Sequence, residues 1–78
     1  MTADAAKRLL EIAKVIGPDP QGRIFVERVH AVFRNEGGQA YDYRAGIGRL
    51  KRDGLIDMHD SGTFFRMSPD GSAEVAKS

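Results

Sequence analysis

The chain has 78 residues, of which 41% are hydrophobic, and it contains no cysteine. This length and composition predict a single globular domain over residues 1–78 and argue against a disulfide framework or a thiolate metal site. The 12 basic and 11 acidic side chains leave a net charge of +1, which argues against a strongly basic, non-specific nucleic-acid binder.

Nothing in the sequence indicates export or membrane insertion. No apolar run approaches the ~20 residues that cross a bilayer. The first four residues lack the basic and apolar regions of a signal peptide. We therefore expect a cytoplasmic protein with no membrane partner.

The first segment predicts an amphipathic helix over about residues 4–16. Apolar residues recur at helical spacing from Ala6 to Ile16, and charged residues occupy the other face. Gly17 and Pro18 end the helix, because glycine accepts a left-handed conformation and proline cannot continue a helix.

A second helix is indicated by the apolar stripe that runs from Val26 to Phe33, and a double glycine at 37–38 ends it. Its start leaves two alternatives open. Asp19 and Pro20 would serve as N-cap and first residue of the helix. Otherwise residues 23–25 form a short extended stretch and the helix starts after them.

A third helix is predicted over 39–53, with Gly54 just past its C-terminal end. Helical spacing places Ala40, Tyr43, Ile47 and Leu50 on one side, which predicts that they face the core. The opposite side holds Tyr41, Asp42, Ala45, Gly48, Arg49 and Arg52, with Arg44 and Lys51 on the flanks.

After Gly54 the pattern changes to that of a β-hairpin, with strands near 55–59 and 63–67 and a turn at 60–62. Neighbouring residues of a strand point to opposite faces, so one of Phe64 and Phe65 must face the core. Ser68 as N-cap, Pro69 as first residue and Asp70 in the first turn then predict a short final helix.

Two strings of sequence resemble winged helix-turn-helix domains of bacterial and phage regulators. Residues 49–56, RLKRDGLI, resemble the end of the recognition helix and the first wing strand. Residues 64–71, FFRMSPDG, resemble the second wing strand running into the next helix. The resemblance implies an α+β fold with three helices, a β-hairpin wing and a short C-terminal helix.

The resemblance also implies a function. In such domains the exposed face of the third helix enters the major groove of double-stranded DNA, which implies a transcriptional regulator or repressor that uses helix 39–53. Carried over by position, the base-facing candidates are Tyr41, Asp42, Ala45, Gly48 and Arg49, and the phosphate contacts are Arg44, Lys51 and Arg52. Gln39 could reach either, and the wing candidates are His59, Ser61, Thr63 and Arg66.

Two observations leave other interpretations open. The cations of the third helix also suit a solvated helix face near a C-terminus. The wing tip, 59–63, contains no lysine or arginine, and Asp57 and Asp60 make it acidic.

The alternative is a phage or mobile-element protein that binds a protein partner. An inhibitor of a host nucleic-acid-binding complex, such as a CRISPR effector, is one example. Its contacts would be Tyr41, Asp57, Asp60 and Phe64. A homodimer would need an apolar patch, for which Ile12 with Val15, or an exposed Phe64, are the candidates.

The sequence offers no catalytic residue and indicates that the protein is not an enzyme. His30 and His59 lie far apart and lack the spacing of metal ligands. No glycine-rich phosphate loop follows a strand, and the serines have no triad context. We expect no metal, no cofactor and no small-molecule substrate.

Overall fold

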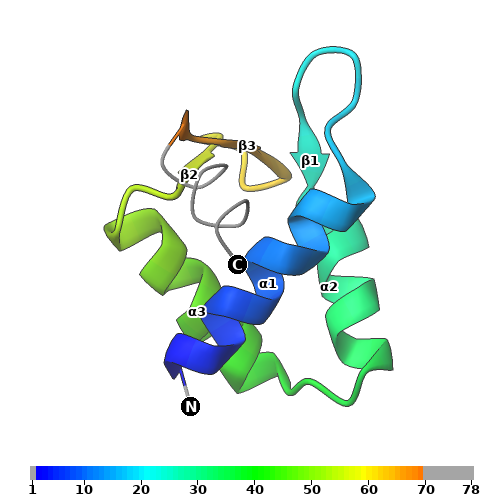
Figure 1. The fold of residues 1–78 in the computed structure, drawn as a ribbon, viewed down its shortest axis with the longest axis vertical. Helices are drawn as coiled ribbons and strands as arrows, with labels where there is room; N and C mark the ends of the chain where they lie inside the picture. The colour runs from blue at the N-terminus through cyan, green and yellow to red at the C-terminus, as the bar shows by residue number, and fades with distance from the viewer. Residues whose placement is uncertain (1, 70–78) are drawn as a thin grey trace.

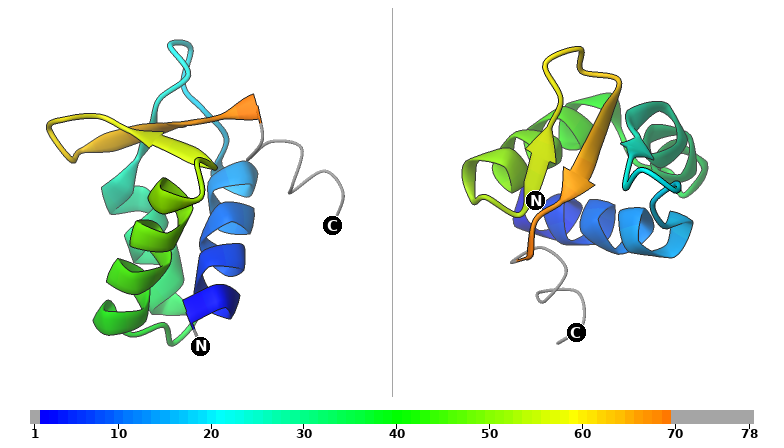
Figure 2. Two further views of the ribbon diagram at one scale, coloured as in Figure 1. Left: turned by 90° about the vertical axis from the view of Figure 1, so that its left-hand side faces the viewer. Right: turned by 90° about the horizontal axis from the view of Figure 1, so that it is seen from above.

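The computed structural model describes residues 2–69, which form an α+β domain of three helices and a three-stranded antiparallel sheet. Figure 1 shows the helices packed together, with the sheet across one end of them. The hairpin tip projects beyond the helices in Figure 2. In chain order the elements are α1 (Thr2–Ile16), β1 (Ile24–Phe25), α2 (Val26–Asn35), α3 (Ala40–Arg52), β2 (Ile56–Met58) and β3 (Phe64–Met67).

The third strand of the sheet, β1, comes from the segment before α2. β3 is central, with β1 on one side and β2 on the other. Ile24 lies opposite Phe65, and Asp57 lies opposite Arg66. Alternation therefore directs Ile24, Ile56 and Phe65 into the core.

The structure selects the second of the two alternatives for the start of α2. The helix begins at Val26, and Asp19 organises the preceding loop instead of capping a helix. The Asp19 carboxylate accepts hydrogen bonds from the backbone N–H groups of Gln21 (2.9 Å) and Arg23 (2.8 Å). These bonds lie in the loop just before β1, where Ile24 and Phe25 are extended because they pair with β3.

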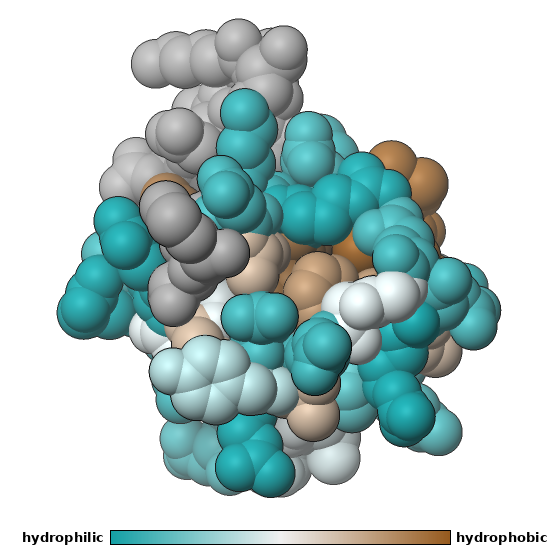
Figure 3. Space-filling view, turned by 90° about the horizontal axis from the view of Figure 1, so that it is seen from below, coloured by the Kyte–Doolittle hydropathy of each residue, from teal (hydrophilic) through white to brown (hydrophobic). Residues whose placement is uncertain are grey.

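The core lies between the helices and the inner face of the sheet. Its most buried large side chains are Leu9, Ile12, Ile24, Val29, Leu50 and Phe65. The burial of Ile12 corrects one expectation, since that residue cannot contribute to a surface patch with Val15, which is 84% exposed. At the end of the domain where α1 begins and α2 joins α3, hydrophilic residues surround a recessed hydrophobic centre (Figure 3).

The core-facing side predicted for the third helix was confirmed at Tyr43, Ile47 and Leu50 but was wrong at Ala40. Ala40 is exposed, whereas Gly46 is buried together with Tyr43 and Leu50. The reason is the close approach of α1 to α3: a Cβ atom on Gly46 would lie 2.6 Å from Leu9 Cδ1 and 3.1 Å from the backbone nitrogen of Ala6.

Three helices followed by a C-terminal hairpin are consistent with a winged-helix-like topology. The third helix begins and ends one residue inside the predicted 39–53 range. The predicted final helix after Ser68 falls mainly on residues 70–78, outside the described part of the chain. Within residues 2–69 no helix has the length and apolar character needed to cross a membrane.

Candidate nucleic-acid interface

One strip of α3 is exposed along the whole helix and carries most of its positive charge. Steps of three and four residues bring Tyr41, Arg44, Gly48 and Lys51 to one side, with Arg52 beside them. Tyr41 is 78% exposed. We call these five residues the α3 strip.

Two of the three cations of the α3 strip, Arg44 and Lys51, have no ion-pair partner among residues 2–69. Arg52 Nε lies 3.6 Å from Asp53 Oδ1, in contact with the C-cap residue of the helix. The strip itself contains no carboxylate, and the acidic group in contact with it is Asp53, beside Arg52 at the C-terminal end of the helix.

Three of the five predicted base-facing residues lie to one side of this strip. Asp42, Ala45 and Arg49 are half-buried, whereas Tyr41 and Gly48 are exposed. Asp42 and Arg49 stand one turn before and after the buried Gly46, so they flank the α1 contact. Arg49 Nε also donates to Asp53 Oδ2 at 3.2 Å. Gln39 is the exposed N-cap residue of α3 and makes no side-chain capping bond.

A groove of about 330 Å³ separates the α3 strip from the hairpin. Its apolar lining comes from Val26 at the start of α2, from Tyr43 and Ile47 of α3 and from Met58 of β2. Arg44, Gly48, Lys51 and Gly62 complete it. The sequence identified Arg44, Gly48 and Lys51 as site residues, but Val26, Ile47 and Met58 have the pattern of core residues and gave no signal.

Gly48 is the residue of the groove that the fold itself does not require. It has helical geometry, and a Cβ atom added to it would meet nothing within 4 Å. Glycine inside a helix costs about 1 kcal/mol relative to alanine.

The hairpin tip is held together by its own side chains and carries no cation. The backbone N–H of Ser61 donates to His59 Nδ1 at 3.1 Å, and Ser61 Oγ lies 2.8 Å from Thr63 Oγ1. The N–H of Val26 donates to the carbonyl of Thr63 at 3.0 Å, which ties the tip to the start of α2. His59, Asp60, Ser61 and Thr63 are all exposed, so the tip can offer hydroxyl and backbone contacts but no positive side chain.

Phe64 is covered by groups of its own chain on the outer face of the sheet. The His59 ring stacks on it at 4.4 Å, and the guanidinium groups of Arg23 and Arg66 lie 5.8 and 5.4 Å from its centre. Arg66 Nε also donates to the Gln21 carbonyl at 3.2 Å. Phe64 is therefore half-buried and does not offer an open apolar surface for a protein contact. Asp57, another of the candidate protein contacts, is exposed.

Tyr43 supports the groove from beneath. Its ring stacks on His30 at 4.2 Å between α2 and α3, and the burial of its hydroxyl raises the pKa of Tyr43. Neither Tyr43 Oη nor His30 Nε2 has a hydrogen-bond partner within the described residues. Tyr43 thus acts as a packing ring, as the sequence predicted.

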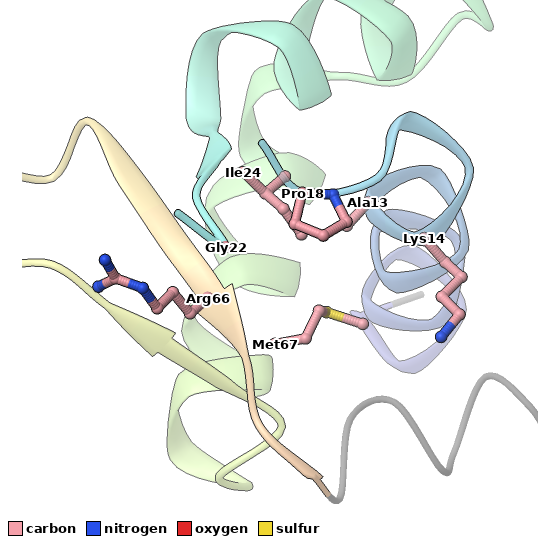
Figure 4. A pocket seen from close by; sticks show the side chains of 7 residues that line it. All are labelled: Ala13, Lys14, Pro18, Gly22, Ile24, Arg66 and Met67. Carbon is pink, nitrogen blue, oxygen red and sulfur yellow. The ribbon is translucent and has the colours of Figure 1, made fainter. Parts of the chain in front are cut away.

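A second hollow, of about 290 Å³, lies between the end of α1 and β3. Figure 4 shows Met67 reaching from β3 toward α1, while Lys14 and Arg66 extend away from the apolar centre. No cluster of three or more possible metal ligands occurs among residues 2–69.

No protein family, no curated protein and no solved structure matches this chain. The class of the protein therefore follows from its own fold, an α+β domain with a winged-helix-like topology.

Proposed function

We propose that this protein is a winged-helix DNA-binding protein of the transcriptional-regulator type, with α3 as the helix that enters the major groove. The observation that carries the proposal is the α3 strip, which contains no carboxylate and in which Arg44 and Lys51 are exposed and form no ion pair within residues 2–69. An α-helix fits the major groove, and phosphate contacts by lysine and arginine supply most of the affinity.

The hairpin contributes less to this proposal than α3 does. Its tip offers Ser61, Thr63 and backbone groups, which position a protein on DNA without reading sequence. The lack of a cation there predicts weak binding by a single copy, with fewer phosphate contacts and hence a shallower fall of affinity with salt than a basic wing would give.

The first experiment is fluorescence anisotropy of a labelled duplex titrated with the protein at about 50 and 200 mM salt. The variant Arg44→Ala/Lys51→Ala should bind more weakly. The slope of log K against log[salt] should fall by about 0.9 for each lost phosphate contact. The control is Lys7→Ala/Lys14→Ala, which removes the same charge from the exposed face of α1 and should bind like the wild type.

Failure of the folded wild-type protein to bind DNA at the lower salt concentration would refute the proposal. Equal loss of affinity in both double variants would show that net charge, rather than α3, determines binding. A protein partner would then become the leading alternative, and Tyr41 would be its first contact to test, because that side chain is 78% exposed.

A further inference from the structure

One glycine of α3 has no structural reason to be a glycine. Within residues 2–69, every other glycine either has a positive φ angle or, like Gly38 and Gly46, would bring an added Cβ within 2.6 Å of a neighbour. Gly48 has neither property. Since glycine destabilises a helix interior, Gly48 lowers the stability of the free protein without improving its packing.

The surroundings of Gly48 indicate what would come close to it. Arg44 precedes Gly48 by one turn and Lys51 follows it by one turn. The open space beside Gly48 is therefore flanked by two cations that form no ion pair within residues 2–69. The groove beside it has an apolar floor that includes Ile47 and Met58. An occupant that matches both features has anionic groups for the rim and apolar carbon atoms for the floor.

A sugar–phosphate backbone has this combination, because charged phosphates alternate with deoxyribose carbons along the strand. We propose that the groove between α3 and the hairpin holds the backbone of one DNA strand, with its closest approach at Gly48. Arg44 and Lys51 would neutralise phosphates on either side of that point. The inference rests on the DNA-binding function proposed above and assigns the groove a specific role in it.

The variant Gly48→Ala tests this role because its effects on stability and on binding should have opposite signs. Replacing glycine inside a helix should raise the Tm by about 4–8 °C. The added methyl group should displace the strand and weaken binding to a labelled duplex roughly tenfold. The salt slope should also fall, by about 0.9 for each phosphate moved out of contact.

Two further variants sharpen the test. Gly48→Leu places a larger side chain at the same point and should weaken binding more than alanine does. Val15→Ala is the control, because Val15 is 84% exposed on α1 and alanine there also favours the helix. That variant should gain stability and keep the affinity of the wild type.

The outcomes separate this inference from the function on which it rests. If the wild type binds DNA and both Gly48 variants bind equally well, the groove contact is refuted while DNA binding stands. If affinity falls but the salt slope does not, the neighbour of Gly48 is a base edge and the backbone assignment is wrong. If the wild type does not bind DNA, both proposals fail together.

Discussion

At Gly46 and Gly48 the same residue type occupies two opposite surroundings, two positions apart in α3. Gly46 is buried where α1 crosses the helix, and Gly48 faces open space beside the groove. The first glycine is explained by packing within the chain. Nothing within residues 2–69 explains the second, and this contrast makes the pair informative.

Gly46→Ala should destabilise the domain, opposite in sign to the change at Gly48. The Cβ atom would clash with Leu9 and press on the backbone of Ala6, which cannot move without shifting α1. Overpacking of this kind costs about 1–3 kcal/mol, against a gain of about 1 kcal/mol in helix propensity. Urea denaturation should show a lower midpoint, and an unchanged midpoint would mean that α1 and α3 are not in such close contact.

Asp19 is the residue through which acid should weaken the fold. Desolvation opposes ionisation, but hydrogen bonds from the backbone and side chain of Arg23 and from the backbone of Gln21 hold the pKa of Asp19 below its ordinary value. A carboxyl group whose pKa is lower in the folded than in the unfolded protein stabilises the fold at pH values above its pKa in the unfolded state. That contribution disappears as the pH falls through the folded pKa.

Asp19→Asn should therefore be less stable than the wild type at pH 7, and the difference should shrink as the pH falls below about 4. Asparagine keeps an oxygen acceptor but loses the ion pair with Arg23 Nε, which the carboxylate makes at 2.7 Å. Thermal melts of both proteins across pH 2–7 would measure this change. A difference that stays constant over the range would contradict the assignment.

At the scale of elements, β3 determines how the two faces of the sheet differ. Its residues alternate, with Phe65 1% exposed in the core and Phe64 half-buried on the outer face. Phe65 pairs with Ile24 on β1 and with Met58 on β2, so it lies at the centre of the sheet.

Phe65→Ala should cost about 3–5 kcal/mol, which is comparable to the whole stability of a small domain. The variant should give a weak or absent cooperative transition in a thermal melt followed by circular dichroism. Phe64→Ala removes the same ring from the neighbouring position and should cost clearly less, because that ring is partly solvated. Similar losses at both positions would contradict the register of β3.

The sequence predicted the elements of the fold better than which residues of α3 are buried. The spacing of Leu9 to Ile16, the stop at Gly17 and the hairpin around 60–62 all correspond to observed elements. On α3 the prediction was wrong at Ala40, which is exposed, and it missed the buried Gly46, because glycine has no side chain to produce a hydropathy signal.

Of the candidate site, the cations and Gly48 could be identified from sequence, but the groove could not. Its floor combines residues from three elements, and hydropathy alone gives Val26 and Met58 the same pattern as core residues. The sequence also left open whether β1 forms. Two residues are too few to show the alternation of a strand, and the preceding Asp19 loop depends on side-chain hydrogen bonds that a hydropathy pattern does not show.

At the scale of the whole molecule, a net charge of +1 conceals an uneven distribution. Some cations are paired among the described residues, as Arg8 is with Glu36, whose pKa is lowered by the hydrogen bond from Arg8. On α3 the Arg44 and Lys51 charges have no such partner within residues 2–69. An overall balance of charge is therefore compatible with a local anion-binding surface.

The central position of β3 also bears on how two copies of the chain could exchange parts. A hairpin attached along one edge only can open and pair with a neighbouring molecule, which is a common route to domain-swapped dimers. Here β3 is hydrogen-bonded on both sides, to β1 and to β2. Exchange of β3 alone would break both ladders, but the β2–β3 ladder lies within the hairpin. Exchange of the whole hairpin would therefore break only the short β1–β3 ladder, in which Ile24 pairs with Phe65 and Phe25 with Phe64, so the sheet gives little protection against swapping at high concentration.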